Sequence, residues 1–384
     1  MTLPAPLAAR LADQRPIVLA RAEAMAVDLP LQTPINLSGR LKLATAEIVV
    51  VRIEAADGTT GWGECASAPA MTGDVIDGML TAIDDFIAPV LIHRDLRRFD
   101  EAIEAVGRAV ARNSAAKAAV DLALHDLVGK VLGVPVCEML GGARRERVAA
   151  MWMLGNATVE GDVAEAAAKC RAGSHVFKLK VGTKAVEADI EAARGVRAAI
   201  GPDAILSVDA NATWSEAQAL RFAQATRDLA LLNLEQPLPA DDLDGMARIA
   251  AAAGAPVCAD EGIRALADLD THAARRAAQG ASLKPLKLGG LAGARRAAER
   301  CAALGLKVNL ADKVGESSLA TAGLLQLAAA VPTLDWNVTP TNHYLADDIV
   351  PGGLAPRDGA FDILQTPGLG VTVDAAQIER YRRR

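Results

Sequence analysis

The sequence predicts an α/β protein in which a closed eight-stranded barrel of β/α units follows an α+β lobe. Three observations lead to this fold class. The chain has 384 residues, more than one hydrophobic core usually holds. Hydrophobic residues make up 51% of it but aromatic residues only 3%, so the core is built from Ala, Leu and Val. After residue 141, short apolar runs alternate with alanine-rich helical segments, as in a parallel sheet.

The first lobe is expected over residues 17–145. Residues 17–53 read as strands, with AEIVVVRIEA as a strong β-branched run and Asp57-Gly58 as the following turn. Apolar spacing of three and four predicts helices over 74–92 and 113–133. The second begins at Asn113-Ser114, residue types that cap helices, and ends at Gly133.

The barrel is expected over residues 146–340, and residues 341–384 are expected to return to the first lobe. A run at 148–153 is the first of eight candidate strands, the number that closes a barrel. The others read FKLKV, ILSVDA, LLNLEQP, PVCADE, ASLKPLK, KVNLAD and TLDWNV.

The second of these runs carries two lysines, Lys178 and Lys180, within the segment VFKLKVG. Side chains alternate along a strand, so both lysines point to one face. An edge strand with its lysines in solvent would explain such a pair. The charges that end the neighbouring runs favour a different explanation.

Consecutive strands finish in charged residues: Asp209, Glu235, Asp260 and Lys284, which follow Lys180 at intervals of 24 to 29 residues, about one β/α unit each. In a barrel these strand ends meet at the C-terminal mouth, where barrel enzymes have their active sites. Each acid alone could be an N-cap of the next helix. Together they predict one pocket lined by three carboxylates and by lysines.

Three uncompensated carboxylates would repel one another, and a divalent cation removes that conflict. Mg²⁺ fits best, since no His or Cys stands at these positions to favour zinc. A carboxylate substrate held by the cation would lose the proton on its α-carbon more readily. We expect Lys178 to hold the substrate carboxylate and to depress the pKa of Lys180, which would exchange the proton.

At these residues the chain resembles the enolase superfamily, in particular its muconate lactonizing enzyme subgroup. The resemblance covers nearly the whole chain. It extends from the lysines and acids above to GWGEC (61–65), AAVDLALHDLVGK (118–130), VDANATW, LEQPL, ADEG and Gly289-Gly290. It implies a modified (β/α)7β barrel with an N-terminal capping domain. It also implies a lysine or histidine base with Mg²⁺ that stabilises an enediolate, with Lys284 as the second lysine of the site.

The resemblance further implies that a loop of the first lobe, residues 31–43, closes over the mouth and sets specificity. Ser38 and Arg40 are its candidates for substrate contact, although Arg40 could equally be a solvated loop residue. Asn211, Asp312 and Asn337 are further candidates for substrate contact. The seventh strand has no histidine, which disfavours the mandelate racemase branch.

The expected activity is a Mg²⁺-dependent isomerase, either a muconate cycloisomerase or a racemase or epimerase. Dipeptide epimerase, N-acylamino acid racemase and o-succinylbenzoate synthase are alternatives within the subgroup. Dipeptide epimerases resemble one another in an Asp-x-Asp after the eighth strand, where this chain has Asp335-Trp336-Asn337. A barrel that only binds its ligand and a Schiff-base aldolase are alternatives of other classes.

Composition bears on partners and location. A formal charge of −6 without a basic stripe disfavours nucleic acid as a partner, and the sequence suggests no membrane span. Five widely spaced cysteines are typical of a reducing compartment, so we expect a cytoplasmic enzyme. The family resemblance implies a homo-oligomer that acts on a small carboxylate.

Overall fold

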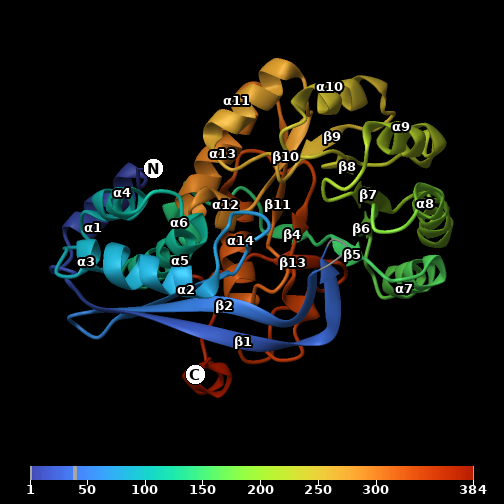
Figure 1. Cartoon of the computed structure of the whole chain (residues 1–384). Coiled ribbons are helices and arrows are strands. Elements are labelled where there is room, and N and C mark those ends of the chain that lie inside the picture. The colour runs from blue at the N-terminus through green and yellow to red at the C-terminus, as the bar shows by residue number, and fades with distance from the viewer. Residues whose placement is uncertain (1, 38–40, 384) are drawn as a thin grey trace.

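The computed structural model describes residues 2–37 and 41–383. The first lobe contains a three-stranded antiparallel sheet in the order β1-β2-β3, formed by β1 (Leu19–Leu37), β2 (Leu41–Ala55) and β3 (Thr60–Ala66). Gly58 has a φ of 89° in the tight connection between β2 and β3, which confirms the predicted turn. β1 and β2 form a long ribbon that runs from the helices of the lobe to the barrel (Figure 1).

Helices cover one face of this sheet. The predicted helix over 113–133 is confirmed as α5 (Ser114–Leu132), which ends at Gly133 with a φ of 64°. Asn113 stands at its N-cap, but its side chain does not cap the helix. The segment predicted at 74–92 is helical with a π-helical turn in the middle. The remaining elements of the lobe are α1 (Ala5–Ala12), α2 (Ile76–Thr81), η2 (Ala82–Ile87), α3 (Ala88–Leu91), α4 (Phe99–Ala109) and α6 (Val136–Met139).

Eight parallel strands form the second sheet, in the order β12-β11-β10-β9-β8-β7-β6-β5, which confirms the expected barrel. The strands are β5 (Trp152–Leu154), β6 (Val176–Lys180), β7 (Ile205–Asp209), β8 (Leu234–Glu235), β9 (Val257–Ala259), β10 (Gly280–Leu283), β11 (Lys307–Ala311) and β12 (Val338–Thr339). An isolated bridge between Ala150 and Val338 joins the first strand to the last, so the barrel is nearly closed.

The run predicted at 148–153 as the first barrel strand is divided in the structure. β4 (Arg147–Ala149) pairs with β13 (Ala360–Asp362) outside the barrel, and only β5 belongs to it. The backbone N–H of Met151 donates to Val338 between the two segments. One apolar run therefore serves two sheets.

Helices alternate with the barrel strands and surround them (Figure 1). A C-terminal segment follows, in which Arg383 pairs with Asp28 and Glu47 of the first lobe at 2.6 and 2.7 Å. The elements are α7 (Val159–Arg171), α8 (Val186–Ile200), α9 (Glu216–Ala225), η3 (Arg227–Leu229), α10 (Leu243–Ala252), α11 (Leu266–Arg275), α12 (Pro285–Leu288), α13 (Leu291–Leu304), α14 (Ser318–Ala330), η4 (Asn342–Tyr344) and α15 (Ala375–Tyr381).

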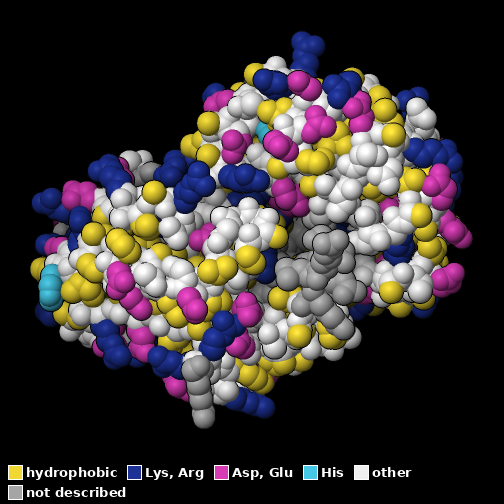
Figure 2. Space-filling view, in the orientation of Figure 1, with side chains coloured by type: hydrophobic (Ala, Val, Ile, Leu, Met, Phe, Trp, Pro, Cys, Tyr) yellow, Lys and Arg dark blue, Asp and Glu magenta, His cyan; other side chains and the backbone are white. Residues whose placement is uncertain are grey.

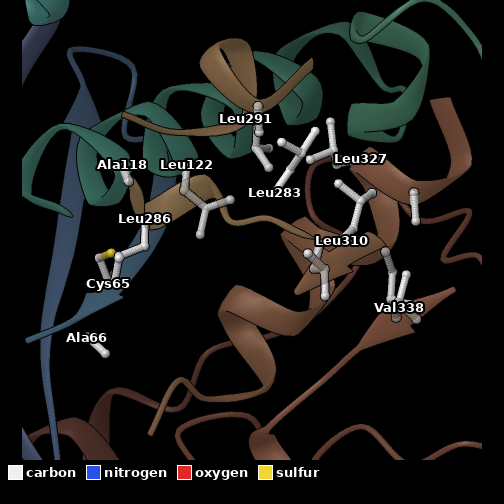
Figure 3. Packing of buried hydrophobic residues seen from close by; sticks show 14 of the residues in the cluster. Cys65, Ala66, Ala118, Leu122, Leu283, Leu286, Leu291, Leu310, Leu327 and Val338 are labelled. Carbon is white, nitrogen blue, oxygen red and sulfur yellow. The ribbon is translucent and has the colours of Figure 1, made fainter. Parts of the chain in front are cut away.

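The two parts share a continuous apolar core. Figure 3 shows Leu286 of α12 next to Cys65 of β3 and near Leu122 of α5, all of them buried. Within the described part of the chain, no helix is both long and apolar enough to cross a bilayer. Acidic and basic side chains are intermingled on the face shown in Figure 2, which is hollowed between the two parts.

Candidate active site

Parallel pairing brings the predicted charged residues to one end of the barrel. Lys180 is the register partner of Asp209, and Asp209 is the partner of Glu235. Asp260 and Lys284 come directly after β9 and β10, at the same end. Because these strands are neighbours, five side chains that are far apart in sequence surround one opening.

The explanation by an edge strand does not hold, because β6 lies between β5 and β7, and both Lys178 and Lys180 line the cavity at the mouth. The Nζ of Lys178 lies 2.6 Å from an Oε of Glu235, and the side chains of both are only 2% exposed. The Nζ of Lys180 lies 2.6 Å from an Oδ of Asp209. The side chain of Lys180 is 28% exposed, and Lys178, although buried, lines the same cavity.

Asp260 is held by two lysines. Lys284 donates to one of its carboxylate oxygens, and Lys287 lies 2.6 Å from the other. Burial raises the pKa of Asp260, but the charges of Lys284 and Lys287 outweigh it and hold this pKa well below the ordinary range. Burial lowers the pKa of Lys284, and the charges of Asp260 and Glu235 more than reverse that effect. In this arrangement Lys284 is an ammonium group.

The sequence reasoning did not single out two residues of this site, Lys287 and Glu261. Lys287 is fully buried one turn after Lys284 on α12, and a lysine inside the apolar segment PLKL was the available signal. Glu261 follows Asp260 in ADEG and accepts a hydrogen bond from Asn211 Nδ2 at 3.1 Å. Burial and the charge of Asp260 raise the pKa of Glu261 to about 7.

Two of the five predicted substrate contacts line the cavity. Asn211 accepts from Lys180 Nζ at 2.8 Å and donates to Glu261, so it links the two. Asp312 follows β11 and accepts from the Thr321 hydroxyl at 2.7 Å. Burial, reinforced by the nearby Glu316, raises the pKa of Asp312 well above its ordinary value.

The structure corrects the placement of Asn337. This residue comes directly before β12 rather than after it, and it is not among the residues that line the cavity. Its backbone carbonyl accepts from Asn309 Nδ2 at 2.9 Å. Asp335 accepts from the backbone N–H of Val308, the second residue of β11, at 3.1 Å and does not line the cavity either. Ser38 and Arg40 lie outside the described residues.

The cavity at the mouth has a volume of about 1840 Å³. Residues of both parts line it: Gln32, Thr45 and Ser67 come from the first lobe, and Lys180 and Lys284 come from the barrel. The ribbon of β1 and β2 reaches the barrel here, where Gln32 Nε2 donates to the carbonyl of Leu345 at 3.2 Å. This contact agrees with the expectation that the first lobe caps the mouth.

Among residues 2–37 and 41–383, no group of three or more His, Cys, Asp or Glu side chains is arranged to hold a metal ion. The oxygens of Asp209, Glu235 and Asp260 are instead turned toward lysines. As a donor set, three carboxylates at adjacent strand ends suit a hard cation such as Mg²⁺. These residues fit the metal in kind and in position along the sheet.

A capped barrel with lysines and acids at its mouth defines a class of barrel enzymes, and comparison with known proteins gives the family. Residues 20–141 match the model of the mandelate racemase / muconate lactonizing enzyme N-terminal domain, and residues 162–377 match the enolase C-terminal domain-like model. The chain belongs to the mandelate racemase/muconate lactonizing enzyme family of the enolase superfamily.

Named relatives in this family differ in reaction. A chloromuconate cycloisomerase of Cupriavidus pinatubonensis is 31% identical over 363 residues, which are 94% of this chain and 97% of that protein. The structure of muconate lactonizing enzyme from Pseudomonas fluorescens complexed with muconolactone has a TM-score of 0.90 at 30% identity, covering 96% of this chain and all of that one. N-succinyl Arg/Lys racemase from Bacillus cereus also has a TM-score of 0.90, at 26% identity, covering 96% and 99%.

Proposed function

We propose that the protein is a Mg²⁺-dependent isomerase that removes and returns a proton α to a carboxylate, through an enediolate. One observation carries the proposal: Lys180 and Lys284 belong to the second and sixth of eight barrel strands, and both line one cavity with Asp209 and Glu235. Strands two and six lie on opposite sides of such a barrel. A planar intermediate between the lysines would present one face to each.

The lysines divide the work by their exposure. Lys178 is buried but lines the same cavity, and although burial lowers its pKa, Glu235 and Asp209 raise it above the ordinary value. It therefore stays an ammonium group, suited to attract the substrate carboxylate. Lys180 and Lys284 line the cavity and can exchange a proton with an α-carbon placed between them. Asn211 orients Lys180 through the 2.8 Å hydrogen bond.

Asp209, Glu235 and Asp260 would hold Mg²⁺. When bound, the cation would supply positive charge that stabilises the negative charge developing on the substrate carboxylate. In the structure each of these acids pairs with a lysine of the site. Ser38 and Arg40 stay proposed contacts for the part of the substrate that is remote from the reacting carbon.

The finer choice lies between cycloisomerisation and racemisation or epimerisation. Two opposed lysines suit both: if each exchanges a proton, the stereocentre is inverted, and if one acts, the other steadies charge. Because Asp335 accepts from the backbone N–H of Val308, it is a poor partner for the ammonium group of a dipeptide, but dipeptide epimerisation stays an alternative of the same chemistry. N-acylamino acid racemisation and o-succinylbenzoate synthesis remain alternatives of the same chemistry.

The proposal predicts that removing any one acid abolishes turnover and weakens Mg²⁺ binding while leaving the fold intact. Asp209→Asn, Glu235→Gln and Asp260→Asn each delete one anionic ligand and preserve the side-chain shape. Mg²⁺ affinity would be measured by calorimetry and folding by circular dichroism. Wild-type Mg²⁺ affinity in all three variants would exclude this metal site.

A screen of cis,cis-muconates, N-acyl amino acids and dipeptides for deuterium uptake from D₂O at the α-carbon tests the reaction class. An isomerase of this type incorporates solvent deuterium with its substrate. A barrel that only binds ligands incorporates none. A Schiff-base aldolase would instead be trapped covalently by borohydride with a carbonyl substrate, which the proposed mechanism forbids.

A further inference from the structure

Every polar atom of Asp260 has a hydrogen-bond partner. The residue is fully buried, and it does not itself line the cavity. Its backbone N–H donates to Gln236, and its backbone carbonyl accepts from Lys287. One carboxylate oxygen, Oδ1, also accepts from Lys287, and the other, Oδ2, accepts from Lys284. Asp260 is thus held by residues that follow β8 and β10, the strands on both sides of β9.

Lys287 contacts Asp260 and has no donor left for a ligand. Its Nζ lies 2.6 Å from Asp260 Oδ1 and 3.0 Å from the carbonyl oxygen of Ser282, and it donates to the carbonyl of Asp260 as well. These three acceptors match the three N–H groups of one ammonium. The side chain is 0% exposed and is not among the residues that line the cavity. Lys287 is therefore not a further lysine for proton exchange with a substrate.

Gln236 fixes the backbone of Asp260. Its Oε1 accepts from the N–H of Asp260 at 2.9 Å and from that of Gly262 at 3.2 Å, and its Nε2 donates to the carbonyl of Leu238 at 2.9 Å. Gln236 is buried and has a φ of 30°, in a region that few residues other than glycine occupy. The three hydrogen bonds hold it in this conformation. The backbone of Asp260 is therefore kept in place while Lys287 keeps its carboxylate in place.

The two carboxylate oxygens of Asp260 are not equivalent. Oδ2 is on the cavity side, because its partner Lys284 lines the cavity. Oδ1 is on the inner side, because its partner Lys287 is fully buried and does not line the cavity. Turning Oδ1 toward the cavity would leave a buried ammonium group without its carboxylate, which is strongly unfavourable. Asp260 therefore offers one oxygen to a cation, and Lys287 determines which one.

We propose that Lys287 is a positioning residue that limits Asp260 to one ligand oxygen and thereby makes the metal site selective for Mg²⁺ over Ca²⁺. Mg²⁺ requires a near-octahedral set of ligands at short distances, whereas Ca²⁺ accepts more oxygens and often takes both oxygens of one carboxylate. A carboxylate that neither turns nor offers its second oxygen suits the smaller ion. This inference rests on the proposed function, because it takes Asp260 as a metal ligand.

Calorimetry of cation binding to the full chain tests this role without substrate or turnover. The wild type should bind Mg²⁺ more tightly than Ca²⁺. Lys287→Met removes the ammonium group and frees Oδ1 of Asp260. The ratio of the Mg²⁺ to the Ca²⁺ association constant should then fall by about tenfold or more, the usual effect of changing a residue that orients a metal ligand. Lys287→Gln, which keeps a polar group at this buried position, should lower the ratio too and serves if the methionine variant does not fold.

Lys313→Met is the matched control. Lys313 lines the cavity after β11, and in the described part of the chain the ion pairs of Asp209, Glu235 and Asp260 are made with other lysines. This variant makes the same chemical change and removes one positive charge from the cavity wall. It should strengthen the binding of both cations and leave their ratio as in the wild type.

Three results would overturn the inference: tighter binding of Ca²⁺ than of Mg²⁺ by the wild type, a wild-type ratio in the folded Lys287 variants, or an equal fall of the ratio in Lys313→Met. A lysine that only stabilised the fold would lower the melting temperature and change both affinities in proportion, which leaves the ratio unchanged. The proposed function fails separately. If Asp209→Asn, Glu235→Gln and Asp260→Asn all bind Mg²⁺ as the wild type does, the metal site itself is excluded, whatever the ratio.

Discussion

At the scale of single residues, Lys180 and Lys284, which both line the cavity, are expected to serve opposite faces of the substrate. For a racemase or epimerase, Lys180→Ala should stop α-proton exchange from one stereoisomer, while exchange from the other persists through Lys284. Lys284→Ala should show the reverse. We expect each loss to be about 10²-fold or more, the usual contribution of a positioned acid or base.

A cycloisomerase would give a different pattern in the same two variants. One lysine moves the proton and its loss stops the reaction, while the other variant keeps part of the rate because that lysine only stabilises charge. Deuterium incorporation followed by NMR distinguishes the patterns. Wild-type exchange in both variants with a verified substrate would show that neither lysine is a base.

The residues of the site that could be predicted from the sequence are those that end a strand. A charged residue after an apolar run is visible in sequence, and the repeat of one β/α unit places Asp209 and Glu235 side by side. The same reasoning failed for Asn337. The segment TLDWNV contains a turn in which Asn337 has a φ of 61°, and only the last residue of this segment, Val338, enters β12. Lys287 and Glu261 were missed because Lys284 and Asp260, which precede them, already accounted for the charge in the segments ASLKPLK and ADEG.

At the scale of elements, the helix predicted most clearly, α5, packs directly on the backbone of β3. A Cβ at Gly63 would lie 2.1 Å from the carbonyl oxygen of Ala119, and one at Gly61 would lie 2.3 Å from that of Ala123. The glycines of GWGEC are thus explained by the close approach of a helix, which apolar spacing alone could not reveal. The division of the run 148–153 between two sheets could not be predicted from the sequence either, because both of its parts are apolar.

We predict that Gly63→Ala destabilises the protein by about 3 kcal/mol or more, because backbone atoms of α5 cannot move away as a side chain could. Gly107→Ala is the matched control. Gly107 lies inside α4, and a Cβ there meets no atom within 4 Å, so this change should stabilise by about 0.5 to 1 kcal/mol. Thermal melting followed by circular dichroism would compare them. Equal melting temperatures of the two variants would contradict the packing argument.

At the scale of the whole molecule, the first lobe and the barrel are joined by buried carboxylates as well as by apolar side chains. Glu64 of β3 accepts from the backbone N–H and the hydroxyl of Ser317, both at 2.6 Å. Glu316 accepts from the backbone N–H of Ala66 at 3.3 Å. The acid of GWGEC therefore belongs to the interface that fixes the cap over the mouth, and it lies outside the cavity lining.

This interface predicts a pH dependence of stability. Burial raises the pKa of Glu64 from 4.5 to about 8, although the hydrogen bonds from Ser317 oppose the shift. Between these values the folded protein holds a proton that the unfolded chain has released, so the free energy of unfolding falls as pH rises from about 4.5 to 8, by at most about 1.4 kcal/mol per pH unit from this group.

Glu64→Gln keeps an acceptor for the N–H and a donor for the hydroxyl but cannot ionise, so its melting temperature should fall less between pH 5 and 8 than that of the wild type. Glu191→Gln, an exposed change on α8, should follow the wild type. If Glu64→Gln loses stability with pH as steeply as the wild type and this control, Glu64 is ionised in the folded protein and the cap is held in another way.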